Sequence, residues 1–347
     1  MYKHNVAIIF GGCSPEYDIS LKSAFGVISH INKDKYEPIM LGITRKGEWY
    51  LFTGAVEKIN DDTWHNQHDC IKAIISPDCE TKGIIVFGID GIQTIKLDAA
   101  MPIMHGKNGE DGTIQGLLTL AGIPVIGCNI LSSALCMDKD RAHKLAKAAG
   151  VRVAKSFIIK SELEYMQAVP LAESLGYPLF VKPVKAGSSF GITKVACKDD
   201  LLKAIILAFE YDNEVIIEEN ICGFEVGCAV IGSTNPTVGE IDEIELTEGF
   251  FDYKEKYNLE SSSIHVPARI PIHKADEIKE TAKVLYKALG CSGFARVDMF
   301  LTPEGDIVFN EINTIPGFTA FSRFPNMLKA TGMTFEQIVN EIIAINL

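Results

Sequence analysis

Two carboxylates, an amide and a guanidinium fall on two neighbouring segments of the chain that read as β-strands, residues 294–300 and 307–313. Alternate residues of a strand face the same side. Two carboxylates with an amide oxygen suit a hard cation such as Mg²⁺, and a neighbouring guanidinium suits phosphate or a developing oxyanion. The pattern therefore points to nucleotide-dependent chemistry at four residues, Arg296, Asp298, Glu311 and Asn313.

The turn between the two strands decides whether these side chains meet. If Glu304-Gly305 is a two-residue hairpin loop, Asp298 lies opposite Glu311. Arg296 then lies opposite Asn313. A structural ladder of salt bridges would use the same pairing, so the hairpin alone leaves both readings open.

Donors suited to phosphate groups occur earlier in the chain. The loop Gly187–Gly191 follows a strand that carries Lys182. Its glycines let backbone amides turn toward phosphate oxygens, and its serine hydroxyls add donors. A plain turn is the structural alternative, and the loop does not match GxxxxGK[ST], which excludes a P-loop protein. Lys139, on a helix expected over residues 131–149, would by itself be read as a solvated side chain.

Two further segments could complete a nucleotide site. Glu218–Ile221 ends an apolar strand and is either a plain exit or a hinge whose backbone meets an adenine edge, with Glu225 placed for ribose hydroxyls. The irregular segment 247–263 is long enough to be a functional loop. Its aromatic residues and lysines suit a lid that excludes water and brings positive charge to a γ-phosphate, although the aromatics of a surface loop could simply pack down.

Composition narrows the class of protein. The 347 residues are 47% hydrophobic and 22% charged, which is typical of a globular protein. The net charge is −12 with scattered basic residues, which argues against nucleic acid as a partner. Nine cysteines without a CxxC pair indicate reduced thiols and no zinc site. No segment has the ~20 apolar residues of a membrane span, and the apolar run 6–10 is too short for a signal peptide. We expect a cytoplasmic protein.

The order of expected elements predicts an α/β (α+β) fold of three units. Strands at 6–10, 36–43 and 99–104 alternate with helical stretches, which favours a parallel sheet with ligand loops at the carboxyl ends of its strands. Glu16 and His105 follow two of these strands, where each is more often a structural residue than a catalyst. The units are residues 1–128, 129–213 and 214–347, with the lid at 247–263 in the third.

Taken together, these segments resemble the ATP-grasp carboxylate–amine ligases, specifically the D-alanine–D-alanine ligases and their vancomycin-resistance relatives. The resemblance covers nearly the whole chain and implies a three-domain ATP-grasp fold with a Rossmann-like N-terminal domain. It rests on motifs that occur in the family's order: Gly11–Ser20, His105–Gly116, Met137-Asp-Lys139, Val181–Ser189, Phe251–Tyr257, Arg296-Val-Asp298 and Asn310–Thr319.

The resemblance also implies a role for each candidate. ATP would be held by Lys139, Lys182, Ser189, Glu218, Glu219, Ile221, Glu225 and Lys256. Two Mg²⁺ ions, or Mn²⁺, would be held by Asp298, Glu311 and Asn313. The first D-amino acid would meet Glu16, linked through Ser188 to Tyr257, and the oxyanion would be stabilised by Arg296 and the Gly317 amide. The substrates would be further contacted by His105, Asp242, Phe251, Ser322 and Arg323. The family also implies a homodimer.

The second substrate is the finer question. Plain D-alanine ligases usually carry Ser-Leu where this chain has Ser322-Arg323, and often tyrosine where it has Phe251. Arginine donors favour a substrate hydroxyl, although Arg323 could also be a rim charge that binds carboxylate generally. Together with Asp242 and Phe251, the pattern is similar to the VanG-type D-alanine–D-serine ligases. We predict D-serine as the second substrate, with an ordinary D-alanine–D-alanine ligase as the alternative. A non-catalytic nucleotide-binding module and a nicotinamide-dependent oxidoreductase rank lower, since Arg296 and the metal-type residues are present and GxGxxG is absent.

Overall fold

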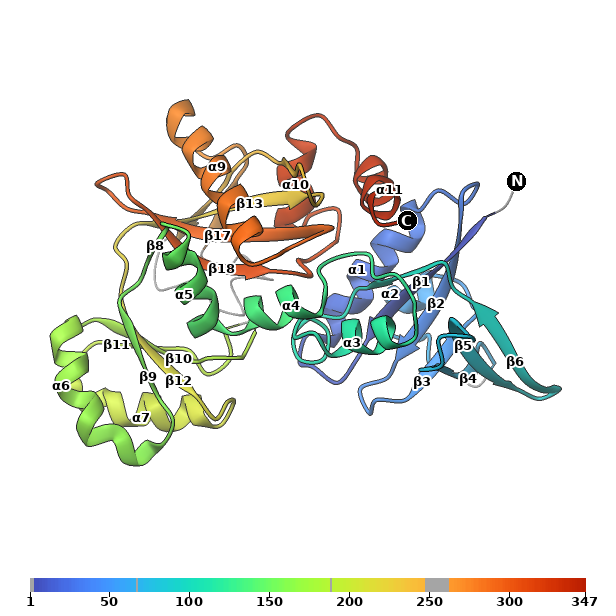
Figure 1. Ribbon diagram of the computed structural model, residues 1–347, viewed down its shortest axis with the longest axis horizontal. Coiled ribbons are helices and arrows are strands. Elements are labelled where there is room, and N and C mark those ends of the chain that lie inside the picture. The colour runs from blue at the N-terminus through green and yellow to red at the C-terminus, as the bar shows by residue number, and fades with distance from the viewer. Residues whose placement is uncertain (1–2, 67, 188, 247–261) are drawn as a thin grey trace.

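The computed structural model describes residues 3–66, 68–187, 189–246 and 262–347. Three β-sheets with helices packed on their faces make up this part of the chain, in the mixed α/β arrangement that the sequence predicts (Figure 1). Within these ranges, each helix is too short or too polar to cross a bilayer.

The N-terminal sheet has seven strands in the order β6-β5-β4-β3-β2-β1-β7. Strand β1 is parallel to β2 and β7, as the sequence predicts. The strands β3 to β6, which the sequence did not reveal, extend this parallel part with antiparallel pairs. The elements are β1 His4–Gly11, α1 Tyr17–His30, β2 Tyr36–Ile43, β3 Trp49–Phe52, α2 Glu57–Asn60, β4 Cys70–Ile75, β5 Gly83–Gly88, β6 Gly91–Lys96, β7 Ala99–Pro102 and α3 Thr113–Leu120.

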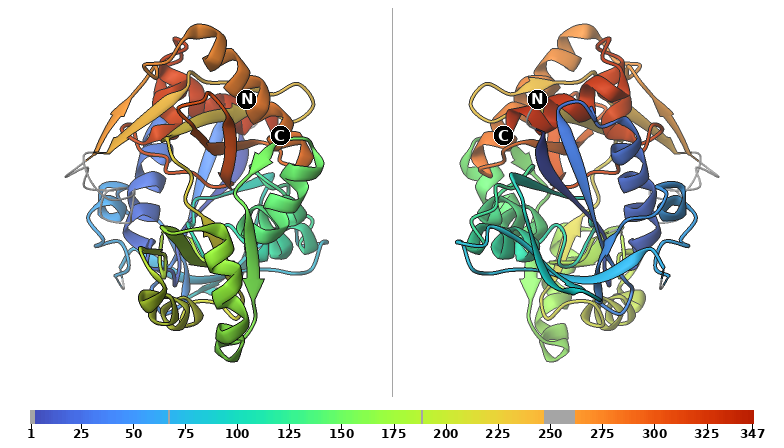
Figure 2. Two further views of the ribbon diagram at one scale, coloured as in Figure 1. Left: turned by 90° about the vertical axis from the view of Figure 1, so that its left-hand side faces the viewer. Right: turned by 90° about the vertical axis from the view of Figure 1, so that its right-hand side faces the viewer.

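The middle sheet has four antiparallel strands in the order β11-β10-β12-β9. Helices α6 and α7 cover the face that is turned away from the third sheet (Figures 1 and 2). The elements of this region are α4 Ile130–Met137, α5 Lys139–Ala148, β8 Arg152–Val153, β9 Ser156–Ile159, the 3₁₀ helix Glu162–Glu164, α6 Tyr165–Leu175, β10 Leu179–Pro183, β11 Thr193–Val195, α7 Lys198–Phe209 and β12 Val215–Glu219.

The third sheet follows the order β16-β15-β13-β17-β18-β8, with β14 paired to β13. Helix α11 packs on α1 of the N-terminal region. Ile338 of α11, with Phe318 and Phe324 from the segment before it, shares a core with Phe10 and Leu21. The elements are β13 Phe224–Ile231, β14 Thr237–Val238, β15 Asp242–Leu246, β16 Ser262–His265, α9 Ile272–Ala288, β17 Phe294–Leu301, β18 Ile307–Asn313, α10 Arg323–Lys329 and α11 Phe335–Ile345.

The predicted hairpin is confirmed, but its loop is not. Asp298 pairs with Glu311 and Arg296 with Asn313. The two-residue loop is wrong, because five residues, 302–306, join the strands and Gly305 takes a positive φ of 89°. A β-bulge between Asp298 and Met299 shifts the register by one residue. The longer loop and the bulge compensate each other, so the pairing at the polar face is the predicted one.

The single helix expected over residues 131–149 is also wrong. Asp138 has an extended backbone with φ −88° and ψ 99°, and it separates α4 from α5. Its carboxylate accepts a hydrogen bond of 3.0 Å from the Arg141 amide, which caps the N-terminus of α5. Lys139 is therefore the first residue of a new helix and not a side chain on a continuous helical face.

Candidate active site

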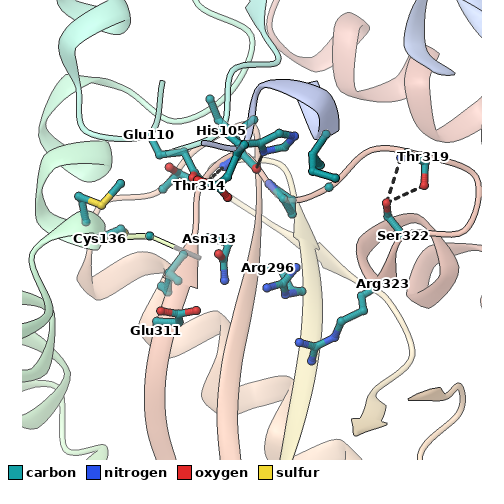
Figure 3. A pocket seen from close by; sticks show the side chains of 18 of the residues that line it. His105, Glu110, Cys136, Arg296, Glu311, Asn313, Thr314, Thr319, Ser322 and Arg323 are labelled. Atoms are coloured by element: carbon teal, nitrogen blue, oxygen red, sulfur yellow. Dashed lines mark hydrogen bonds between the residues drawn. The ribbon is translucent and has the colours of Figure 1, made fainter. Parts of the chain in front are cut away.

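A cavity of about 360 Å³ opens where β18 leaves the third sheet and meets the N-terminal region (Figure 3). Its walls come from α1, the loop after β7, α4, α5, the loop after β10 and the β17–β18 hairpin. Segments more than 290 residues apart in the sequence thus meet in one site. Nine predicted residues line it, namely Glu16, His105, Lys139, Arg296, Glu311, Asn313, Gly317, Ser322 and Arg323.

The hairpin presents its polar face to this cavity. Arg296 donates to both oxygens of Asp298, from Nε at 2.8 Å to Oδ1 and from Nη2 at 2.7 Å to Oδ2. Asn313 Nδ2 donates to the same Asp298 Oδ2 at 2.7 Å. Asp298 is 1% exposed and Arg296 9%, and buried charges of this kind need a partner. Arg296, Asp298 and Asn313 thus form one hydrogen-bonded group, and Glu311 lies opposite Asp298 on the partner strand.

The donor set of this face fits a hard cation. Two carboxylates that lie directly opposite each other, at Asp298 and Glu311, repel unless positive charge lies between or beside them. Among the described residues, no three His, Cys, Asp or Glu side chains gather as a metal cluster. A cation here would thus bind through two carboxylates and an amide, with other oxygens from its substrate, which is the way Mg²⁺ is usually held beside phosphates.

Arg323 joins the same face from helix α10. Its Nε donates to Asp242 Oδ2 at 2.6 Å, its Nη1 to Glu225 Oε1 at 2.8 Å, and its Nη2 lies 3.3 Å from Asp298 Oδ1. Burial disfavours the charged guanidinium, yet the carboxylates of Asp242 and Asp298 hold the pKa of Arg323 well above its usual value.

The sequence places Asp242, Glu225 and Arg323 in the site but does not reveal that they bind one another. A Cβ on Gly227 would lie 2.6 Å from both Arg323 Nη2 and Asp242 Oδ1. Only glycine at this point of β13 therefore leaves room for the ion pair.

The two lysines predicted to bind phosphate lie on α5 and β10, and of the two it is Lys139 that lines the cavity. Lys139 Nζ donates to the Ala186 carbonyl at 2.8 Å, which ties α5 to the loop that contains Ser189. Lys182 forms a buried ion pair with Glu218 across the β10–β12 pairing. Glu218 Oε2 is buried and has no hydrogen-bond partner within the described ranges. An acceptor left open in this way is ready for a donor from a bound molecule.

Some predicted residues lie away from the cavity or outside the described ranges. In the described part of the chain, the cavity lining does not include Lys182, Ser189, Glu218, Glu219, Ile221, Glu225, Asp242 or Asp298. Glu219 Oε1 accepts from the Lys155 amide at 2.9 Å, at the outer edge of the middle sheet. Ser188, Phe251, Lys256 and Tyr257 are outside the described residues, and so is most of the predicted lid.

A buried group that includes His105 closes the cavity toward the N-terminal sheet. His105 Nδ1 lies 2.8 Å from the Ile315 carbonyl, and Ser14 Oγ donates to the His105 carbonyl at 2.7 Å. Burial lowers the pKa of His105, so the ring is neutral at pH 7. The contact with Ile315 joins the loop after β7 to the exit of β18. The contacts of His105 thus hold these two loops in position relative to each other.

Glu110 is the main cavity residue that the sequence analysis missed. Its Oε2 accepts from the Gly106 amide at 2.7 Å and its Oε1 from the Ile315 amide at 3.2 Å, so one carboxyl links the two loops. Burial and the nearby Glu16 carboxylate raise the pKa of Glu110 to about 8. Glu110 lies within the motif His105–Gly116, which could have drawn attention to it. Composition and spacing alone did not distinguish this segment from an ordinary turn.

The raised pKa of Glu110 predicts a pH dependence of stability. The folded protein keeps a proton on Glu110 up to about pH 8, whereas an unfolded glutamic acid loses it near pH 4.3. The folded state thus binds more protons between these values, and its stability falls as the pH rises through that window. We expect the free energy of unfolding in urea to fall from pH 5.5 to pH 8.5 by about 2–4 kcal/mol more in the wild type than in Glu110→Gln.

An exposed carboxyl serves as the control for this measurement. Glu304 is an exposed residue of the hairpin loop, and Glu304→Gln should retain the full wild-type fall. An equal fall in wild type and Glu110→Gln would contradict the assignment.

Comparison with known proteins places the chain in a family. Residues 5–128 match the model of the D-ala D-ala ligase N-terminus, and residues 145–344 match that of the D-ala D-ala ligase C-terminus. The chain is 45% identical to the vancomycin B-type resistance protein VanB of Enterococcus faecalis, over 99% of each sequence. It is 42% identical to the vancomycin C-type resistance protein VanC1 of Enterococcus gallinarum, over 98% of this chain and 97% of that protein.

A solved structure gives the same result in three dimensions. The crystal structure of the VanG D-Ala:D-Ser ligase from Enterococcus faecalis is similar to this chain with a TM-score of 0.93 and 54% sequence identity, over the full length of both chains. The two family models span most of the sequence, and the cavity has a carboxylate–arginine face. The chain therefore belongs to the D-alanine–D-alanine ligase family of ATP-dependent ligases, among its vancomycin-resistance type members.

Proposed function

We propose that this enzyme joins D-alanine to D-serine with hydrolysis of ATP, through a D-alanyl phosphate, and so supplies a modified peptidoglycan precursor in vancomycin resistance. The observation that supports it most is the carboxylate–arginine face of the cavity, where Arg296, Asp298, Glu311 and Asn313 share one side of a hairpin. The relative of known structure that is named a D-Ala:D-Ser ligase is 54% identical over the whole chain. We further propose that it works in the cytoplasm as a homodimer.

The first step would transfer the γ-phosphoryl group of ATP to the carboxylate of D-alanine. Lys139 and Lys182 would hold the phosphates with Ser189, while the backbone of Glu218, Glu219 and Ile221 would meet adenine. Glu225 would bind the ribose, and Lys256 of the lid would reach the γ-phosphate. Such catalysis consists mostly of positioning and charge neutralisation, which agrees with a site whose cations are held in place by buried partners.

The metal would be held by Asp298, Glu311 and Asn313. Two Mg²⁺ ions, for which Mn²⁺ could substitute, would neutralise charge on the phosphates during transfer. Arg296 and Arg323 already neutralise Asp298 in the protein alone.

In the second step the amine of the acceptor attacks the acyl phosphate, and phosphate leaves. Arg296 and the Gly317 amide would stabilise the tetrahedral oxyanion. Glu16 is 7% exposed beside Gly106 and Gly187, where it would hold the ammonium of the first D-alanine through the link to Ser188 and Tyr257. The lid over residues 247–263, with Lys256 and Tyr257, would keep water from the acyl phosphate.

The acceptor site would consist of His105, Asp242, Phe251, Ser322 and Arg323. Ser322 Oγ is 2.8 Å from Thr319 Oγ1 and accepts from the Thr319 amide at 3.1 Å, which fixes it at the cavity edge (Figure 3). Arg323 is held by Asp242, so its position is set before substrate binds. A polar site built in advance favours an acceptor with a hydroxyl group, which supports D-serine over D-alanine.

An acceptor panel tests this proposal. We expect kcat/KM for D-serine to exceed that for D-alanine by about tenfold or more, with ATP, Mg²⁺ and D-alanine as the first substrate, and little product with D-lactate. A clear preference for D-alanine would sink the D-serine assignment and leave an ordinary D-alanine–D-alanine ligase. Phosphate release that needs neither D-alanine nor Mg²⁺ would argue against a ligase of either kind.

A further inference from the structure

Three cysteines gather behind the wall of the cavity, and none of them has a part in the proposed reaction. Cys136 Sγ lies 3.6 Å from Cys291 Sγ, although 155 residues separate them in the sequence. Cys128 hydrogen-bonds to Cys291 and contacts the Ser292 carbonyl at 3.4 Å. All three are buried. Cys291 is therefore within reach of two other thiols at the base of the site.

The three thiols differ in their access to small molecules. Cys136, in the last turn of α4, lines the cavity, whereas Cys128 and Cys291 do not (Figure 3). The hydrogen bond to Cys291 and burial hold the pKa of the Cys128 thiol well above its usual value. The hydrogen bond with Cys136 and burial do the same for the pKa of Cys291, so the position of Cys136 at the cavity, and not acidity, decides which thiol is oxidised first. A small oxidant that enters through the cavity meets Cys136 first, and Cys291 is the thiol directly behind it.

We propose that Cys136 and Cys291 are an oxidation site, at which hydrogen peroxide converts the two thiols into a disulfide. Peroxide would first oxidise the Cys136 thiol to a sulfenic acid and leave as water. The Cys291 sulfur would then attack the Cys136 sulfur, and the sulfenic hydroxyl would leave with the Cys291 proton as a second water. Two thiols lose two electrons in total, and one peroxide accepts them.

The disulfide would disturb the site because of where its two halves lie. A disulfide brings sulfurs to about 2 Å, so the last turn of α4 must move toward the start of β17. Cys136 is two residues before Asp138, which caps α5 and fixes Lys139. Cys291 is five residues before Arg296 on the connection into β17. The cross-link thus pulls on the segments that carry two catalytic cations.

The experiment treats the purified enzyme with hydrogen peroxide, blocks the remaining thiols by alkylation and maps the peptides without reduction. We expect a peptide pair that joins Cys136 to Cys291, with a mass two hydrogens below the sum of the free thiols. Loss of most ligase activity should accompany it and be reversed by dithiothreitol. The activity readout depends on the proposed function, whereas the cross-linked peptide does not, so the two can fail separately.

Variants of the other two thiols provide the controls. Cys291→Ser should show basal activity and resist peroxide, and Cys291→Ala serves if the serine is not tolerated in this buried place. Cys128→Ala should form the Cys136–Cys291 link as the wild type does. A Cys128–Cys291 link, no link at Cys136, or equal inactivation of the Cys291 variants would overturn the proposal. The exposed Cys13, Cys79, Cys197 and Cys222 are oxidised equally in every variant and so cancel in the comparison.

Discussion

Arg296→Ala should lower kcat for dipeptide formation by about 10²–10³-fold while nucleotide binding persists. The guanidinium lies on the face of the hairpin that lines the cavity, held by three hydrogen bonds to Asp298. Donors fixed in this way cost no reorganisation when negative charge develops on the oxygen of the reacting carboxyl group. The effect should fall on kcat, because the oxyanion exists only in the transition state and the intermediate.

The fold should survive this substitution. Without Arg296, the Asp298 carboxylate keeps the amide of Asn313 at 2.7 Å and the guanidinium of Arg323 at 3.3 Å. The measurement pairs steady-state kinetics with calorimetric titration of an ATP analogue, whose Kd should change less than threefold or so. Arg296→Lys keeps the charge but loses the fork geometry, so its kcat should lie between those of wild type and alanine. Wild-type activity in Arg296→Ala would refute the role.

Local patterns in the sequence predicted the parts of the site that lie on regular strands. Alternation along two strands placed Arg296, Asp298, Glu311 and Asn313 on one face, and the observed pairing agrees. The loop was predicted to have two residues and has five, 302–306. A bulge beside Met299 shifts the register by one residue, which restores the predicted pairing at the polar face. A bulge depends on how the neighbouring strands twist and pack, which no count of residues reveals.

Contacts between distant segments were beyond the reach of the sequence. Asp242 and Glu225 are 81 and 98 residues from the Arg323 that they bind, and Glu110 is 205 residues from the Ile315 amide. These partners are far away in the sequence, so propensity and spacing could not identify them. The break at Asp138 was equally hidden, since a continuous helical pattern spans α4 and α5 and only the extended backbone of Asp138 separates them.

Arg323→Ala should cost about 3–5 kcal/mol of the free energy of unfolding. The side chain is 7% exposed and joins three acidic residues, of which Asp242 is 0% and Asp298 1% exposed. Removal of the guanidinium leaves these carboxylates buried with less compensation, and an uncompensated buried charge is far more costly than a lost surface pair. Urea unfolding followed by circular dichroism measures the difference.

A surface ion pair of the same chemistry gives the matched control. Arg152 bonds to Asp306 with side chains 48% and 56% exposed, so Arg152→Ala should cost no more than about 1 kcal/mol. Equal losses in the two variants would mean that Arg323 acts by packing and not by charge.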